Sequence, residues 1–232
     1  MKDFVEQASE VLSIRLDLER LLLVGNAQYK RSLFLYAKDS AIPNFVARIP
    51  GHINSERRCR TEQENLRAFT HYSLGGLCAP VALAEMPYQE FTCFFQSVVV
   101  SEQWQSRIPN RGPKPRRRDF MEATRYLVEL YQHTSRASAS DVPQCFQHGD
   151  FWMGNLGQAG TRLVLYDFEY ASTTGTPLHD LFHFCLYYRV ALRNRGLVGM
   201  EVVEGRYKRD GDRRAFSVTI EDIHEVFITR GP

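Results

Sequence analysis

Long apolar runs and paired cysteines are both missing from this 232-residue chain. No stretch approaches the roughly 20 consecutive apolar residues that a membrane-spanning helix requires. The five cysteines are odd in number and widely spaced, and none forms a CxxC pair, so neither a disulfide framework nor a paired-cysteine zinc site is indicated. Residues 1–20 mix both charges among their apolar positions and lack the apolar centre of a signal peptide. These absences predict a soluble, cytoplasmic protein with no membrane partner.

A strong charge of one sign is missing as well. The chain has 29 basic and 27 acidic residues, and a net charge of +2 is too small to imply a nucleic-acid or membrane partner. The basic cluster RGPKPRRR, residues 111–118, could bind nucleic acid, but a charged run between lobes is usually solvated, so we expect no such partner. What the chain does have is 44% apolar residues, enough for one large domain or two modest lobes.

Residues 1–100 are predicted to form a small antiparallel sheet with one helix packed against it. The prediction rests on helical spacing of apolar residues in some segments and on apolar runs separated by glycine and proline in others. The expected elements are a helix over about residues 1–15, strands on either side of Gly25-Asn26, a strand over 44–50, a helix over 55–72, and strands over 81–86 and 91–100.

Residues 101–232 are predicted to form a second lobe that is mainly helical around a short hairpin. Residues 102–118 turn polar and contain three prolines, which indicates a connection and places the lobe boundary near residue 100. The expected elements are a helix over about residues 119–135, a strand over 161–168, a helix over about 178–194 and a last helix near 219–228.

Oxygen-bearing side chains with a spacing suited to Mg²⁺ follow in two nearby segments. Asp150 and Asn155 are five residues apart in FQHGDFWMGNLG, residues 146–157, and Asp167 comes directly after the apolar residues LVLY. Mg²⁺ prefers oxygen ligands and keeps waters and phosphate oxygens in its shell, so one carboxylate and one amide can be the protein's share. The third group is then free to meet a substrate hydroxyl.

The order of residues 148–150 (HGD), Asn155 and residues 167–169 (DFE) resembles the signature of the aminoglycoside phosphotransferase and choline kinase-like family, relatives of the protein kinases. Gly149 stands where protein kinases have arginine, and Glu169 where they have the glycine of DFG. Both departures point to small-molecule kinases. The resemblance implies an α+β, protein kinase-like two-lobe fold, with a small antiparallel-sheet N-lobe containing one helix and a mainly helical C-lobe with a short catalytic hairpin.

The resemblance also implies roles for these residues. Asp150 would orient the acceptor hydroxyl and take its proton, and Asn155 and Asp167 would hold Mg²⁺ on the phosphates of ATP. His148 would be structural, and Asp180, in the segment GTPLHDL, would brace the catalytic loop.

Two weaker matches lie in the first lobe. Arg48 stands where the family usually places a phosphate-binding lysine, and Glu62 resembles the helix glutamate that pairs with it. We expect Arg48 to touch ATP phosphates, although arginine replaces a compact ammonium by a planar fork. The turn over residues 25–31 would lie over the nucleotide, and the backbone of residues 96–101 would pair with adenine.

Other interpretations stay open at this stage. His179, His183 and Cys185 could bind zinc, but the glutamate of an HExxH site is missing, since Asp180 follows His179. Trp152 could pack or line an acceptor pocket.

Two functional classes follow from the resemblance. The first is an ATP- and Mg²⁺-dependent phosphotransferase acting on a hydroxyl of a small molecule such as an aminoglycoside, a sugar, choline or a related amino alcohol. The second is a catalytically reduced pseudokinase that binds nucleotide or a protein partner. The presence of Asp150, Asn155 and Asp167 favours the enzyme. Arginine at position 48, and a stretch after Asp180 that is shorter than the family's, favour the alternative.

Overall fold

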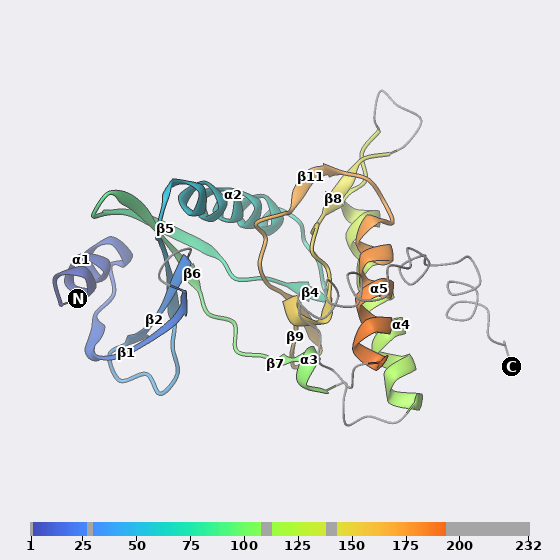
Figure 1. The fold of residues 1–232 in the computed structure, drawn as a ribbon, viewed down its shortest axis with the longest axis horizontal. Coiled ribbons are helices and arrows are strands. Elements are labelled where there is room, and N and C mark those ends of the chain that lie inside the picture. Colours follow the sequence, from blue (N-terminus) through green and yellow to red (C-terminus); the bar gives the residue numbers. More distant parts are fainter. Residues whose placement is uncertain (1, 27–29, 108–112, 138–142, 194–232) are drawn as a thin grey trace, which may run out of the picture.

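The computed structural model describes residues 2–26, 30–107, 113–137 and 143–193 of the chain. Figure 1 shows the N-terminal sheet on one side, helices α4 (Pro113–Thr134) and α5 (His179–Arg193) on the other, and helix α2 (Ile53–Thr70) at the top between them. The predicted last helix near residues 219–228 lies outside the described residues. None of the helices in the described ranges is long and apolar enough to cross a membrane.

The N-terminal part is a five-stranded sheet with the strand order β1-β2-β3-β6-β5, and every neighbouring pair is antiparallel. This confirms the predicted small antiparallel sheet with its helix. The elements are α1 (Lys2–Leu12), β1 (Leu16–Asn26), β2 (Lys30–Ala37), β3 (Phe45–Pro50), α2 (Ile53–Thr70), β5 (Ala82–Tyr88) and β6 (Phe91–Ser97).

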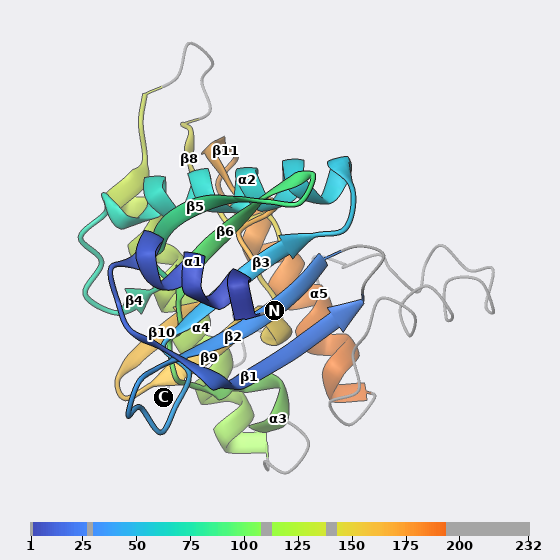
Figure 2. The ribbon, with the colours of Figure 1, turned by 90° about the vertical axis from the view of Figure 1, so that its left-hand side faces the viewer.

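The two faces of this sheet carry different side chains because residues alternate along each strand. Leu33, Leu35 and Ala47 are buried in one core with Phe4 and Val5 of helix α1, which lies across the sheet in Figure 2. The residues between them in sequence face the other side, toward helix α2. That side holds the polar residues of the site described below.

Helix α2 begins at a capping box. His52 is the N-cap, its Nδ1 accepts from the backbone N–H groups of Asn54 and Ser55, and the Ser55 hydroxyl accepts from the His52 N–H. These bonds satisfy backbone donors that the first helical turn leaves without partners. Further along, Leu66 and Phe69 are buried in the second core, so the helix is anchored to both halves of the molecule.

The C-terminal part combines helices with two small sheets, of strand orders β4-β10-β9-β7 and β11-β8. Strands β9 and β10 form the predicted hairpin, with Gly160 in the left-handed region at its turn. The elements are β4 (Leu77–Cys78), β7 (Glu102–Gln103), α3 (Trp104–Arg107), α4 (Pro113–Thr134), β8 (Cys145–Gln147), a 3₁₀ turn (Met153–Asn155), β9 (Leu156–Ala159), β10 (Arg162–Leu165), β11 (Ser172–Gly175) and α5 (His179–Arg193).

The interpretation of residues 102–118 as an irregular connection was wrong for much of that stretch. Helix α4 begins at Pro113, well before the predicted start near residue 119. Pro113 and Pro115 fall in the first turn, where backbone N–H groups have no intrahelical acceptor, so proline costs no hydrogen bond there. The side chains of the basic cluster that precede Arg118 lie outside the described residues.

Candidate active site

The loop between β8 and β9 carries the first two predicted site residues. Asn155 Nδ2 donates to Asp150 Oδ2 at 2.8 Å and to the Asp150 carbonyl at 3.0 Å, so the amide fixes the carboxylate and its own Oδ1 remains as an acceptor. Gly149 has φ +81, and a Cβ there would collide with the Tyr170 carbonyl. The loop therefore requires glycine at position 149 for both its backbone angle and its close packing.

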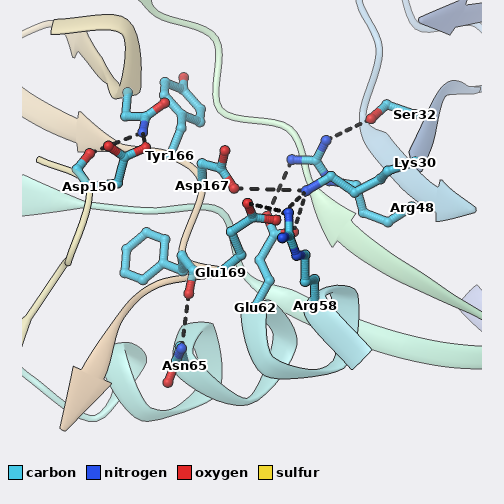
Figure 3. A network of polar contacts seen from close by, with 12 residues as sticks. Lys30, Ser32, Arg48, Arg58, Glu62, Asn65, Asp150, Tyr166, Asp167 and Glu169 are labelled. Carbon is cyan, nitrogen blue, oxygen red and sulfur yellow. Dashed lines mark hydrogen bonds and ion pairs between the residues drawn. The ribbon is translucent and has the colours of Figure 1, made fainter. Parts of the chain in front are cut away.

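Asp167 follows β10 and lies beside this loop. The N–H of Tyr166 donates to the Asn155 carbonyl at 3.0 Å, and the Tyr166 carbonyl is 2.9 Å from Nε2 of His148. Asp167 itself has φ +61, a left-handed conformation that aspartate tolerates better than most residues. These contacts bring the segments of Asp150, Asn155 and Asp167 together, and Figure 3 shows Asp150 and Asp167 on either side of Tyr166.

Asp180 anchors the start of the loop from helix α5. Its side chain is fully buried, and its two carboxylate oxygens accept from the N–H groups of His148 at 2.7 Å and Gly149 at 2.8 Å. His148 is buried and packs edge-on against Phe168. Asp180 therefore fixes the backbone of His148 and Gly149 at the start of the loop.

A layer of charged side chains lies between the sheet and Asp167. Glu62 on α2 pairs with Arg48 at 3.3 Å and with Lys30 at 3.4 Å. Lys30 also lies 3.4 Å from Glu169 and 3.8 Å from Asp167. Figure 3 shows these side chains pointing toward one another from β2, β3, α2 and the segment after β10.

Burial and charge act oppositely on two carboxyls of this layer. Burial alone would raise the pKa of Glu62, but the Arg48 guanidinium and the Lys30 ammonium hold that pKa below its usual range. Burial raises the pKa of Asp167, and Lys30 offsets this only in part. Asp167 Oδ1 is buried and has no hydrogen-bond partner within the described structure. A cation bound beside Asp167 would therefore offset the cost of burying its charge.

A cavity of about 280 Å³ adjoins these residues. Its walls include Arg48, the segment from Gln96 to Val99, Gly154 and Tyr166. The Tyr166 hydroxyl donates to the Val99 carbonyl at 2.7 Å, so the segment after β6 is tied to the hairpin that carries Asp167. Arg48 and the segment from Gln96, which was predicted to meet adenine, therefore line the same cavity. Gly154 and Tyr166, which directly precede Asn155 and Asp167 in the sequence, line it as well.

Several contacts of the site were not predicted from the sequence. Lys30 was taken only as part of the turn over the nucleotide, yet it reaches three carboxylates. His183 was considered as a zinc ligand, yet its Nε2 lies 3.6 Å from Asp150 Oδ1 and its Nδ1 is 3.4 Å from the Phe151 carbonyl. Asn65 on α2 donates to the carbonyls of residues 168 and 171 at 2.9 and 2.8 Å. Within the described ranges, no group of three or more His, Cys, Asp or Glu side chains could hold a metal ion.

The Trp152 ring is half-buried and packs against Tyr187, with ring centroids 5.6 Å apart. The same Tyr187 ring lies 4.5 Å from that of His183. Aromatic side chains therefore continue from the loop that carries Asp150 onto helix α5.

Comparisons with known proteins agree with this geometry. Residues 101–216 match the model of a phosphotransferase enzyme family, APH, whereas no curated protein matches the chain. The apo form of a thermostable mutant of aminoglycoside phosphotransferase APH(4)-Ia is similar in structure, with a TM-score of 0.60, 11% identity, and coverage of 91% of this chain and 84% of that one. The GDP and kanamycin complex of APH(2")-IIia gives a TM-score of 0.57 and 10% identity, with 97% of each chain covered. At such identities the structural likeness shows the fold alone. Since the family model matches half of the chain, this protein belongs to the APH family of phosphotransferases and has its protein kinase-like fold.

Proposed function

We propose that this protein transfers the terminal phosphoryl group of ATP, with Mg²⁺, to a hydroxyl of a small molecule in the cytoplasm. The observation that carries the proposal is the placement of an oriented carboxylate, Asp150, beside an amide oxygen of Asn155 and a buried carboxylate oxygen of Asp167 that accepts no hydrogen bond in the described structure. Phosphoryl transfer depends mainly on positioning and on neutralising charge, so a small set of residues suffices.

Asn155 and Asp167 fit a magnesium ion. The Asn155 Nδ2 is already used by Asp150, which leaves Oδ1, and the buried Oδ1 of Asp167 has no hydrogen-bond donor in the described structure. Both are hard oxygen donors of the kind that Mg²⁺ prefers. When bound, Mg²⁺ would neutralise charge on the phosphate oxygens.

Asp150 is proposed to orient the acceptor hydroxyl and to take its proton. Its carboxylate is fixed by Asn155 and lies near His183, while Asp180 holds the backbone at the start of the loop. Arg48 and Glu62 are proposed to bind the nucleotide, with adenine against the segment from Gln96. Nucleotides have been observed in structurally similar enzymes, with ADP and hygromycin B in APH(4)-Ia and with GDP and kanamycin in APH(2")-IIia, which supports a nucleotide in this fold.

A pseudokinase is the second candidate, and one contact favours it. The Lys30 ammonium lies 3.8 Å from the same Asp167 Oδ1 that would bind the metal, so a cationic side chain already neutralises part of the charge of this carboxylate. The enzyme requires that Mg-ATP displaces this contact.

The cysteines form no disulfide in the described structure. All five are free. Burial raises the pKa of Cys59 to about 12 and that of Cys185 to about 11, so neither thiol is readily ionised at neutral pH.

Melting the protein with and without Mg-ATP tests the proposal. At a ligand concentration of 100 Kd we expect about 2.7 kcal/mol of stabilisation, because the ligand binds only the native state. For a chain of this size that raises the Tm by roughly 5–10 °C.

Asp167→Ala should lose most of this shift. No shift of the wild type at millimolar Mg-ATP would count against the enzyme and against a nucleotide-binding pseudokinase, and an undiminished shift in Asp167→Ala would count against the metal site. If Mg-ATP binds, phosphate transfer to a panel of hydroxylated metabolites separates the enzyme from the pseudokinase.

A further inference from the structure

Lys30 is the cation that connects the helix glutamate with Asp167. It is the first residue of β2 and is largely buried, and its Nζ lies 3.4 Å from Glu62, 3.4 Å from Glu169 and 3.8 Å from Asp167. These three carboxylates come from helix α2 and from the segment after β10. A single ammonium therefore joins the N-terminal sheet to the segment that carries the proposed metal ligand (Figure 3).

The register of the sheet explains how a residue on β2 reaches this position. Ser32 is opposite Arg48, and Lys30 is opposite Pro50, so Lys30 and Arg48 are diagonal neighbours on one face. That face is turned toward α2, because Glu62 contacts both side chains. A lysine on β2 can thus approach the same helix glutamate as residue 48 on the adjacent strand.

Arg48 is held in a different way. Its Nη1 donates to the Ser32 hydroxyl at 2.6 Å and its Nη2 to Glu62 at 3.3 Å, so two nitrogens of the planar guanidinium are fixed on the sheet and the helix. Lysine carries a compact ammonium with three donors on a flexible stem. It can exchange one oxygen partner for another without losing its remaining bonds.

Charge in the layer depends on Lys30. Three carboxylates, Glu62, Asp167 and Glu169, are balanced there by three cations, Lys30, Arg48 and Arg58. Of these cations, Arg58 is exposed and pairs at 3.8 Å with Glu169. Removing Lys30 would leave an excess of negative charge around Asp167, where phosphate oxygens would have to approach.

We propose that Lys30, from β2, supplies the ammonium that binds the phosphates of a nucleoside triphosphate next to Asp167. From the sequence, this role was expected of Arg48, on β3. The inference rests on the proposed function and adds a residue to it. Glu62 orients Lys30, and phosphate oxygens replace its contacts with Asp167 and Glu169. Arg48 keeps Glu62 in place and lines the cavity.

The test compares Lys30→Met with Lys38→Met, titrated with Mg-ATP and separately with adenosine by calorimetry. Lys38 is exposed and lies just beyond the other end of β2. Lys38→Met therefore makes the same chemical change at a position away from Glu62, Asp167 and Glu169. We expect Lys30→Met to lose at least tenfold in affinity for Mg-ATP and less than twofold for adenosine, which has no phosphate. Lys38→Met should match the wild type with both ligands.

The outcomes separate this inference from the proposed function. Wild-type affinity for Mg-ATP in Lys30→Met would overturn the role of Lys30 alone, as would an equal loss of affinity for Mg-ATP and adenosine, which indicates a structural role. Absence of Mg-ATP binding by the wild type would overturn both proposals. Should Lys30→Met fail to fold, Lys30→Gln keeps a polar end at the same position, and the same loss confined to Mg-ATP is expected.

Discussion

Asp150→Ala is expected to lower the rate of phosphoryl transfer by about 10²–10⁴-fold, the usual contribution of a positioned general base. The carboxylate is oriented by the Asn155 amide at 2.8 Å, and His183 lies 3.6 Å from its other oxygen. The substitution removes the group that takes the hydroxyl proton but leaves Asp167 and the cavity unchanged. Affinity for Mg-ATP should therefore stay within a few-fold of the wild type.

Asp150→Asn is the matched variant for this prediction. It keeps the size of the side chain and an oxygen that can accept from Asn155, but it cannot take a proton. We expect the same loss of transfer with either substitution, measured as the rate of phosphate incorporation into the acceptor. Full activity in both variants would exclude Asp150 as the base, and full activity in Asp150→Asn alone would assign it a purely structural role.

Asp180→Ala is expected to destabilise the protein by about 3 kcal/mol, since one buried carboxylate accepts two backbone N–H groups and each bond to a charged group contributes roughly 1.5–3 kcal/mol. The donors are those of His148 and Gly149, which the alanine would leave buried without an acceptor. For a chain of this size we expect the Tm to fall by roughly 6–12 °C. Transfer should fall as well, because the freed segment leads directly into Asp150.

Asp17→Ala provides the control for this substitution. Asp17 is partly exposed, and its carboxylate accepts one backbone N–H, from Glu19 at 3.0 Å. Its removal should change stability by no more than about 0.5 kcal/mol. Thermal unfolding of both variants in the same buffer measures the difference, and equal Tm values would show that Asp180 is not a brace.

The strands of the N-terminal sheet and the main helices could be predicted from the sequence because each depends on a local pattern. Apolar runs punctuated by glycine and proline located β1 to β3, and the spacing of Asp150, Asn155 and Asp167 pointed to one site. The two-residue strands β4 and β7 were not predicted, since a segment so short has no detectable period.

Lys30 could not be identified from the sequence for a different reason. Its partners Glu62 and Glu169 lie 32 and 139 residues away, and they meet only through strand register and the packing of α2. Arg48 drew attention because the family pattern places a cation on that strand, whereas no local pattern distinguishes Lys30 from other lysines near turns. The proposed site residues that were predicted from spacing thus lie near one another in the sequence, whereas the proposed role of Lys30 depends on contacts between distant segments.

The most direct measurement is a crystal structure of the protein with Mg²⁺ and a non-hydrolysable ATP analogue. The account predicts a magnesium ion about 2.0–2.1 Å from Asn155 Oδ1 and from an Asp167 carboxylate oxygen, with the terminal phosphate facing Asp150. A nucleotide bound outside the cavity lined by Arg48 and Tyr166, or a metal held by other residues, would contradict it.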